Sequence, residues 1–314
     1  MARWRAGVAG SPSGLVASRS TRPDDWRRRD RRWGWFFLAP QTIGVTVFVL
    51  LPFVFSMTLA FADWNGLKPI EWIGFTNFIA QASDPLLRKA VLNTLFIGLF
   101  TVPVGLAIAL FYAMLLQHVR GRSLYLVFFF MPVVTSSIAV ALIWQQLLKK
   151  DGILSALVSG AFGVEPPDWL QDPRLALLAL CFIIIWSSMG LNIVIFMAGL
   201  ESIDTSLLEA ARVDGANPVQ VFLKIKLPLI SPVIFFSTVV AFISSMQTFD
   251  AVYVLTSNAG PDNALRTVVY HIYDLGFGQF RFGPSSAAAV LLLVLTLGVT
   301  LVQFGAQKKL VHYD

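Results

Sequence analysis

Cysteine and histidine are scarce in this chain. Its one cysteine, Cys181, lies inside a long apolar run, so an intrachain disulfide and a thiolate metal cluster are both excluded. The three histidines, His118, His271 and His312, are far apart in the sequence and offer neither the spacing of metal ligands nor a partner for a nucleophile. We therefore expect no catalytic residues and no metal site.

A phosphate-binding loop is also missing. No glycine-rich segment of the chain ends in Gly-Lys-Ser or Gly-Lys-Thr, the pattern that cradles nucleotide phosphates. The chain is therefore not expected to bind a nucleotide or another cofactor directly. If ATP drives its activity, a partner must hydrolyse the ATP.

Charge is low as well. Charged residues make up 13% of the chain, against about 25% in soluble domains. Hydrophobic residues make up 56%, and the mean hydropathy is +0.70. Six stretches approach or exceed the roughly 20 apolar residues that cross a bilayer, and none contains Asp, Glu, Lys or Arg. They are residues 35–62, 91–117, 124–148, 175–200, 229–249 and 287–306. This pattern predicts an all-α membrane protein with six transmembrane helices, rather than a soluble protein with long buried helices.

The positions of the basic residues predict the orientation. Six crossings place both termini on one side of the membrane. Sixteen of the 24 Lys and Arg residues lie in the N-terminal tail, the loops 118–123 and 201–228, and the tail after residue 307. Because short cytoplasmic loops are enriched in Lys and Arg, we expect this side, with both termini, to be cytoplasmic.

The chain divides into three parts. Residues 1–33 are rich in Arg, Ser, Pro and Gly, which predicts a disordered basic cytoplasmic tail. Residues 34–308 would form the six-span domain, and residues 309–314 a short cytoplasmic tail. The arginines beside the first span are interpreted as a topology anchor, with contact to anionic lipid as an alternative. The pI of 9.6 needs no nucleic-acid partner, and none is expected.

The loop 201–228 has the sequence of two short helices joined by a sharp turn. Asp204 is a suitable N-cap for the first helix, and Gly215 is suited to end it in a left-handed conformation. Asn217 and Pro218 supply an N-cap and a first-turn proline for the second helix. The alternative is an amphipathic helix at the membrane surface with no partner, which would not need this break.

The same loop carries a pattern of fixed spacing. Glu209-Ala210-Ala211 is followed by Gly215 and then, after nine intervening residues, by Ile225 and Leu227-Pro228. This pattern resembles the cytoplasmic coupling loop of the permease (transmembrane) subunits of bacterial ATP-binding-cassette carbohydrate importers of the maltose and glycerol-3-phosphate type. The residues that the resemblance assigns to ATPase coupling are Glu209, Ala210, Ala211, Asp214, Gly215, Ile225, Leu227 and Pro228.

The resemblance runs from about residue 35 to the C-terminus. Smaller matches are Asn93-Thr94, Trp169-Leu170 with Asp172-Pro173, and Thr248-Phe249-Asp250. Gly260-Pro261 also matches, but many members have Gly-Gly before this pair where the chain has Asn258-Ala259. This departure falls in an outer loop and leaves the resemblance intact.

The resemblance implies the fold of a type I importer permease, with six transmembrane helices and a cytoplasmic coupling-helix elbow, in the bacterial plasma (inner) membrane. The implied partners are a second homologous permease, expected to be a different chain, two ATP-binding subunits, an extracytoplasmic solute-binding protein and membrane lipid. ATP and Mg would be bound by the separate ATPase subunits. The chain itself would not be an enzyme.

The path of the solute is expected where polar or aromatic groups interrupt the apolar spans. The candidates are Asn93, Trp144, Gln145, Trp186, Ser187, Ser188, Asn192, Gln247 and Asp250. Each has an alternative role in helix packing or at the membrane interface. Asn192 and Gln247 are favoured, because an amide inside an apolar span usually faces a partner or a cavity.

Two rival functions are a secondary transporter and a channel for small polar solutes. An ion-coupled transporter needs an ionisable residue inside a span, and all 18 acidic residues lie outside the six stretches. A channel does not need the elbow. The sequence leaves open whether the solute is a sugar, glycerol-3-phosphate or a glycerophosphodiester.

Overall fold

The computed structural model describes residues 23–310, which fall into two units that meet between Phe55 and Ser56. In the first unit, α1 (Pro23–Val45) continues through a π-helical turn, η1 (Thr46–Leu50), into α2 (Leu51–Leu59). The last residues of α2 belong to the second unit. The segment Trp33–Leu59 is long and apolar enough to cross a membrane.

The start of α1 corrects the sequence analysis. The sequence predicts disorder through residue 33, whereas the helix already begins at Pro23. Proline is tolerated in the first turn of a helix, and residues 24–33 contain no further proline or glycine. Extending an adjacent helix also avoids the cost of nucleating a new one. The other residues of the two predicted tails, 1–22 and 311–314, lie outside the described residues.

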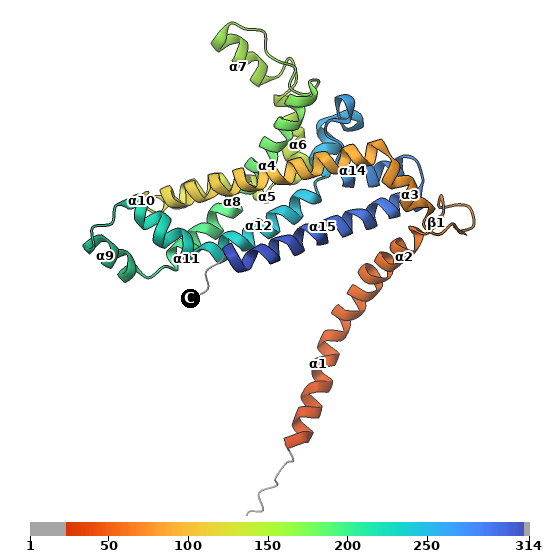
Figure 1. Ribbon diagram of the computed structural model, residues 1–314, viewed down its shortest axis with the longest axis horizontal. Helices are drawn as coiled ribbons and strands as arrows, with labels where there is room; N and C mark the ends of the chain where they lie inside the picture. The colour runs from red at the N-terminus through yellow and green to blue at the C-terminus, as the bar shows by residue number, and fades with distance from the viewer. Residues whose placement is uncertain (1–22, 311–314) are drawn as a thin grey trace, which may run out of the picture. The chain divides into compact units, whose positions relative to one another are not determined.

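Three long helices dominate the second unit: α4 (Pro85–Leu116), α8 (Pro173–Glu201) and α15 (Phe282–Leu310) (Figure 1). α4 and α8 begin in the same way. Asp84 and Asp172 each accept hydrogen bonds from backbone N–H groups of the first turn, and a proline follows at the first helical position. Each of the three helices is long and apolar enough to cross a membrane.

Two further apolar segments are sharply bent. α5 (Arg122–Val134) and α6 (Ser137–Leu147) meet at 98°, and the helical segment Pro218–Leu229 meets α12 (Ser231–Met246) at 65°. Residues 23–310 therefore contain four helices that can cross a membrane, or up to six if each bent pair is one span. The described part of the chain is that of a mostly helical membrane protein in either case.

Residues 124–148 are one apolar stretch in the sequence analysis, and the structure divides this stretch into α5 and α6 at a sharp break. Thr135 and Ser136 leave the helical conformation there, just after Pro132. Serine and threonine side chains compete with the backbone for hydrogen bonds: the Thr135 hydroxyl donates to the carbonyl of Met131. A polar break within the apolar run is the result.

The remaining elements are short. They are β1 (Ala62–Asp63) paired antiparallel with β2 (Glu71–Trp72), α3 (Thr76–Ser83), α7 (Ile153–Phe162), α9 (Thr205–Val213), α10 (Pro218–Val221), η2 (Phe222–Lys226), α11 (Leu227–Leu229), α13 (Asp250–Leu255), η3 (Ser257–Ala259), η4 (Pro261–Asn263), α14 (Val268–Tyr273) and η5 (Asp274–Gly278). Most of them lie between the long helices. Several carry the polar groups described below.

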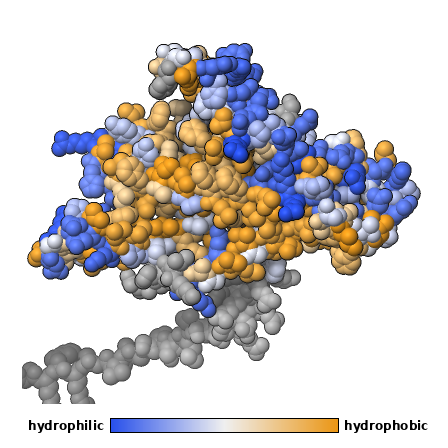
Figure 2. All heavy atoms as spheres, turned by 45° about the horizontal axis from the view of Figure 1, so that its top comes forward, coloured by the Kyte–Doolittle hydropathy of each residue, from blue (hydrophilic) through white to orange (hydrophobic). Residues whose placement is uncertain are grey.

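The surface of the chain is rich in exposed apolar side chains. Leu99 of α4, Phe128 of α5 and Leu301 of α15 are 66%, 70% and 70% exposed. Much of the face in Figure 2 is hydrophobic, and hydrophilic side chains gather toward its edges. A surface of this kind is suited to lipid or to other membrane subunits, not to water.

The crossing of α8 over α5 depends on a glycine. A Cβ atom at Gly190 would lie 2.1 Å from the carbonyl oxygen of Phe129, far inside van der Waals contact. We expect Gly190→Ala to lower the free energy of unfolding by about 2 kcal/mol, because the two backbones must separate. Denaturation in detergent would measure the loss. Gly298→Ala is the matched control: it lies in α15 with no atom within 4 Å, and an unchanged or slightly higher stability is expected.

Candidate functional site

The elbow between α8 and α12 is held by local capping hydrogen bonds. Asp204 accepts the backbone N–H of Ser206 at 2.9 Å, and this bond lowers the pKa of Asp204. α9 ends where Gly215 takes a φ of +78°, and the N–H of Ala216 donates to the carbonyl of Ala211 at 3.0 Å. That pair of features is a Schellman cap, which lets the chain reverse direction within a few residues.

The second helix of the elbow begins with a capping box. The Asn217 side chain accepts the backbone N–H of Gln220, and the Gln220 side chain accepts the backbone N–H of Asn217, both at 2.9 Å. Pro218 occupies the first turn. The whole elbow is therefore specified by residues close together in the sequence.

The elbow presents an exposed apolar edge. Val213 is 88% exposed and Val219 63%, while Leu207 and Leu223 are also exposed. Among the residues predicted for coupling, Glu209, Ala210, Asp214 and Gly215 are exposed, whereas Ala211, Ile225, Leu227 and Pro228 are half-buried. The four exposed residues lie in α9 and in the turn that directly follows it. The half-buried residues continue toward α12.

A polar cavity of about 390 Å³ lies where two helical breaks meet α8. One break is the polar step between α5 and α6, and the other separates α12 from α13. The Ser137 hydroxyl donates to Oδ2 of Asp250 at 2.8 Å and so joins the two breaks. Four of the predicted pathway residues line this cavity: Ser187, Ser188, Gln247 and Asp250.

A second, smaller polar cavity of about 160 Å³ adjoins the first through Ser188. Asn192 lines it, one helical turn further along α8, and its side-chain amide donates to the carbonyl of Ser188 at 3.1 Å. Ser244 and Thr101 contribute hydroxyls from α12 and α4. The two cavities place hydrogen-bonding groups along one side of α8.

The other predicted pathway residues lie elsewhere. The Asn93 side chain donates to the carbonyls of Asn263 and Arg266, and that of Gln145 to the carbonyl of Val254. Trp144 packs edge-on against Trp186, with ring centroids 5.6 Å apart. These residues have partners within the chain.

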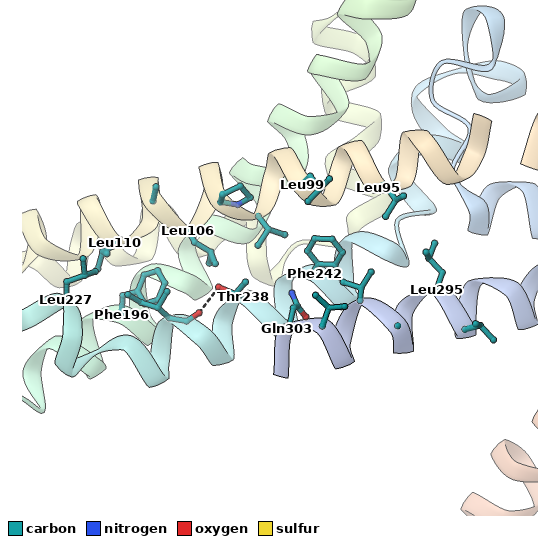
Figure 3. A pocket seen from close by; sticks show the side chains of 18 residues that line it. Leu95, Leu99, Leu106, Leu110, Phe196, Leu227, Thr238, Phe242, Leu295 and Gln303 are labelled. Atoms are coloured by element: carbon teal, nitrogen blue, oxygen red, sulfur yellow. Dashed lines mark hydrogen bonds between the residues drawn. The ribbon is translucent and has the colours of Figure 1, made fainter. Parts of the chain in front are cut away.

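A further cavity, of about 1010 Å³, is apolar (Figure 3). It lies between α4, α12 and α15, and leucine, valine and phenylalanine side chains form most of its wall. The hydroxyl of Thr238, one of its few polar groups, already donates to the carbonyl of Ile234. A polar solute would lose hydrogen bonds to water here without replacing them, so the cavity is suited to a lipid chain or an apolar helix.

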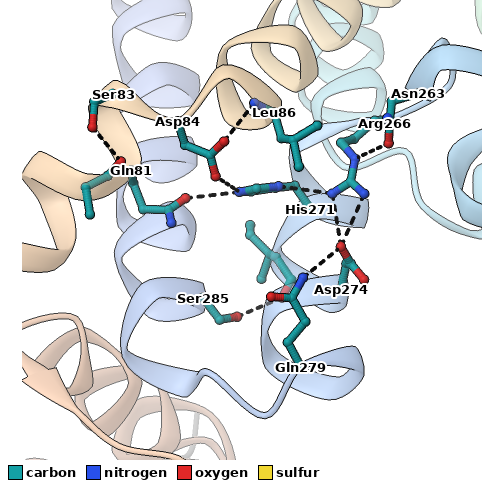
Figure 4. Close-up of polar contacts among 12 residues, drawn as sticks. Gln81, Ser83, Asp84, Leu86, Asn263, Arg266, His271, Asp274, Gln279 and Ser285 are labelled. Atoms are coloured by element: carbon teal, nitrogen blue, oxygen red, sulfur yellow. Dashed lines mark hydrogen bonds and ion pairs between the residues drawn. The ribbon is translucent and has the colours of Figure 1, made fainter.

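A buried polar network ties α14 to α3 and α4 (Figure 4). His271, only 1% exposed, contacts Oε1 of Gln81 at 3.0 Å through Nε2 and Nη1 of Arg266 at 3.2 Å through Nδ1. Arg266 also pairs with Oδ2 of Asp274 at 3.1 Å, and Asp84 lies 3.8 Å from His271. Sequence reasoning missed this network, although Arg266, His271 and Asp274 stand close together in the segment between α13 and α15.

The network makes stability depend on pH. Burial, followed by the Arg266 charge, lowers the pKa of His271 below its ordinary 6.5, despite the opposing carboxylates of Asp84 and Asp274. The unfolded chain therefore takes up a proton at a higher pH than the folded chain does. The neutral, buried His271 therefore contributes its full share to the free energy of unfolding above pH 6.5, and this contribution is lost as the pH falls below 6.5. Thermal denaturation in detergent between pH 7.5 and 5 should show this loss, and His271→Gln should flatten the curve.

No group of three or more His, Cys, Asp or Glu side chains in the described part of the chain is placed to hold a metal ion. Cys181 is a buried free cysteine. The chemistry of the cavities is thus that of hydroxyls, amides and one carboxylate. Such groups bind a polar solute by hydrogen bonds.

A protein-family comparison decides what kind of chain this is. Residues 101–311 match the model of the family described as "Binding-protein-dependent transport system inner membrane component". The chain belongs to this family. It is a permease component, and its membrane location agrees with the apolar helices.

Curated relatives resemble the permease over nearly its whole length. The probable ABC transporter permease protein YesP of Bacillus subtilis (strain 168) is 34% identical over 291 residues, covering 91% of this chain and 94% of YesP. The lactose transport system permease protein LacF of Rhizobium radiobacter is 33% identical, covering 86% and 91%. The sn-glycerol-3-phosphate transport system permease protein UgpA of Escherichia coli (strain UTI89 / UPEC) is 32% identical, covering 91% and 97%.

A solved structure gives the fold. A chain of a bacterial ABC transporter involved in the import of the acidic polysaccharide alginate matches with a TM-score of 0.81 and 23% identity, covering 91% of this chain and 99% of that one. At this identity the match shows the fold alone. The permease thus has the fold of an ABC importer membrane subunit, as the sequence predicted.

Proposed function

We propose that this permease crosses the inner membrane six times, with both termini in the cytoplasm, and forms half of the solute path of an ATP-driven importer. The exposed elbow around Gly215 carries the proposal. Its apolar edge of Val213 and Val219 is accessible beside Glu209 and Asp214, so an ATPase subunit can bind it through apolar and charged contacts. A Schellman cap and a capping box hold the elbow rigid enough to pass a partner's motion to α12.

The proposed assembly contains five chains in all. Two ATP-binding subunits hold ATP and Mg and hydrolyse the ATP, while a second, different permease completes the path. A solute-binding protein delivers the solute from outside. Membrane lipid covers the exposed apolar helices and the groove of Figure 3.

The polar cavity favours a sugar as the solute. Among the residues that line it are three serines, one glutamine and one carboxylate, and none is Lys or Arg. Hydroxyl groups of a sugar can both donate to and accept from these side chains. A phosphate-bearing solute would instead place its charge near Asp250 without a basic residue of this chain beside it. Glycerol-3-phosphate is therefore the second choice, supported by the likeness to UgpA.

Purification of the tagged chain from native membranes in mild detergent tests the assembly. We expect mass spectrometry to find a second permease and an ATPase with a phosphate-binding loop among the co-purifying chains. Uptake of labelled lactose and sn-glycerol-3-phosphate by cells with and without the gene then tests these two solutes. An intact chain recovered alone from several mild detergents would favour a channel or a secondary transporter.

Asp250 offers a test of the solute path. We expect Asp250→Ala to reduce the uptake of the imported solute about tenfold, because a hydrogen bond to a charged group contributes about 1.5–3 kcal/mol. Labelled uptake, corrected for the amount of protein in the membrane, would measure the effect. Asp63→Ala, at an exposed position in β1, is the control and should leave uptake unchanged. Equal uptake in both variants would show that Asp250 does not contribute to the solute path.

A further inference from the structure

A row of four aromatic rings leads away from the polar cavity. Phe249 lines the cavity, and its ring centroid lies 5.5 Å from that of Tyr253. The Tyr273 ring lies 5.0 Å from Phe249 and 5.3 Å from Tyr253, so these three rings pack together, and Phe277 extends the row from Tyr273 at 5.4 Å. The row crosses from α13 to α14 and ends in the turn after α14, so two separate outer segments contribute to it.

The outer end of the row is not part of the core. Tyr253 is 52% and Phe277 65% exposed, although aromatic side chains of this size are usually largely buried. His271, on the opposite side of α14 from Tyr273, is buried in the network of Figure 4. Core packing therefore holds α14 by one face and leaves the aromatic row on the other.

We propose that Phe249, Tyr253, Tyr273 and Phe277 form a stacking track for the pyranose ring of a carbohydrate that moves between the outer surface and the polar cavity. The proposal rests on the proposed import of a sugar. A pyranose has C–H faces that pack on aromatic rings and hydroxyls around its edge. Rings about 5 Å apart let the sugar pass from one face to the next without leaving the track.

The inner end of the track fits this use. Phe249 ends the row beside Asp250, Gln247 and Ser137, so a ring that reaches Phe249 meets hydrogen-bonding groups for its hydroxyls. Tyr273 packs against both Phe249 and Tyr253, with ring centroids 5.0 and 5.3 Å apart, and so holds the middle of the row. The competing explanation is an aromatic belt at the membrane interface, which would respond to lipid and not to a sugar.

Fluorine NMR of the purified complex in lipid nanodiscs can separate the two explanations. The tyrosines are replaced by 3-fluorotyrosine, and the signals of Tyr253 and Tyr273 are assigned by their loss in Tyr253→Phe and Tyr273→Phe. The probe is methyl β-D-glucopyranoside, with sorbitol at equal concentration as an open-chain polyol control. Tyr125 is the internal control, because it is 51% exposed, like Tyr253, but lies on α5 outside the row.

We expect the glucoside to shift the Tyr253 and Tyr273 signals in a saturable way, and neither sorbitol nor the Tyr125 signal to show such a change. Phe277→Leu keeps an apolar side chain but removes the ring, and it should weaken the apparent affinity for the glucoside about fivefold. No shift, an equal shift with sorbitol, or the same shift at Tyr125 would overturn the proposal. The readout needs no ATP and no known solute, so it is independent of whether import itself is observed.

Discussion

Gly215→Val is expected to abolish solute uptake, with a loss of more than about 100-fold, while the chain still inserts in the membrane. Gly215 has a φ of +78°, a conformation that costs an L-residue about 1–2 kcal/mol and a β-branched residue more. No atom lies within 4 Å of the added Cβ, so the effect comes from the backbone and not from a clash. The substitution undoes the cap that holds α9, and the elbow can no longer bind the ATPase subunit in one orientation.

The measurement is the amount of ATPase subunit that co-purifies with the tagged chain, together with uptake of the imported solute. Gly121→Val is the matched control, since Gly121 has the same φ of +78° and also has no atom within 4 Å. It begins α5 and lies outside the elbow. We expect the control to keep both the ATPase subunit and uptake. Loss of uptake in both variants would point to general strain, and retained uptake in Gly215→Val would exclude the coupling role.

Local features of the chain could be predicted from the sequence. The caps at Asp204, Gly215 and Asn217 each depend on hydrogen bonds between residues at most five positions apart. The apolar stretches likewise identify the long helices, because a window of some 20 apolar residues has one stable conformation in a membrane.

Contacts between distant segments could not be predicted. Ser137 and Asp250 are 113 positions apart, and only the fold shows that they bind one another across two helical breaks. Asn93 was a pathway candidate because a polar group interrupts an apolar span there, yet its partners are the carbonyls of Asn263 and Arg266, 170 and 173 positions away. The sequence identifies a polar group that needs a partner, but it does not identify the partner.

The 98° break at Thr135 shows that a high mean hydropathy over a long run can mask a short polar segment that breaks the helix. The apolar run 124–148 favours one continuous helix, and the polar triplet Thr135-Ser136-Ser137 occupies only a small part of it. That triplet, three residues after Pro132, was nevertheless the sign of a break. The polar cavity that we propose as part of the solute path lies at this position.

Arg266→Met is expected to give the largest loss of stability, about 3 kcal/mol. Arg266 is 6% exposed and its guanidinium contacts Asp274, His271 and Asn263, so its removal leaves the Asp274 carboxylate without its cation in a partly buried site. Breaking a buried ion pair from one side typically costs about 3–5 kcal/mol, and the lower value applies because Asp274 keeps 30% of its side chain exposed. Chemical denaturation of the detergent-solubilised chain would measure the change. Arg281→Met, at an exposed position in the same region, should change stability by less than about 0.5 kcal/mol.

A double variant tests the physical reason for this loss. If the uncompensated carboxylate is the main cost, Arg266→Met combined with Asp274→Asn should be more stable than Arg266→Met alone, because no charge is then left without its partner. Recovery should be incomplete, since the hydrogen bonds of Arg266 to Asn263 and His271 stay broken. A double variant less stable than the single one would show that Arg266 acts by filling space and not through its charge.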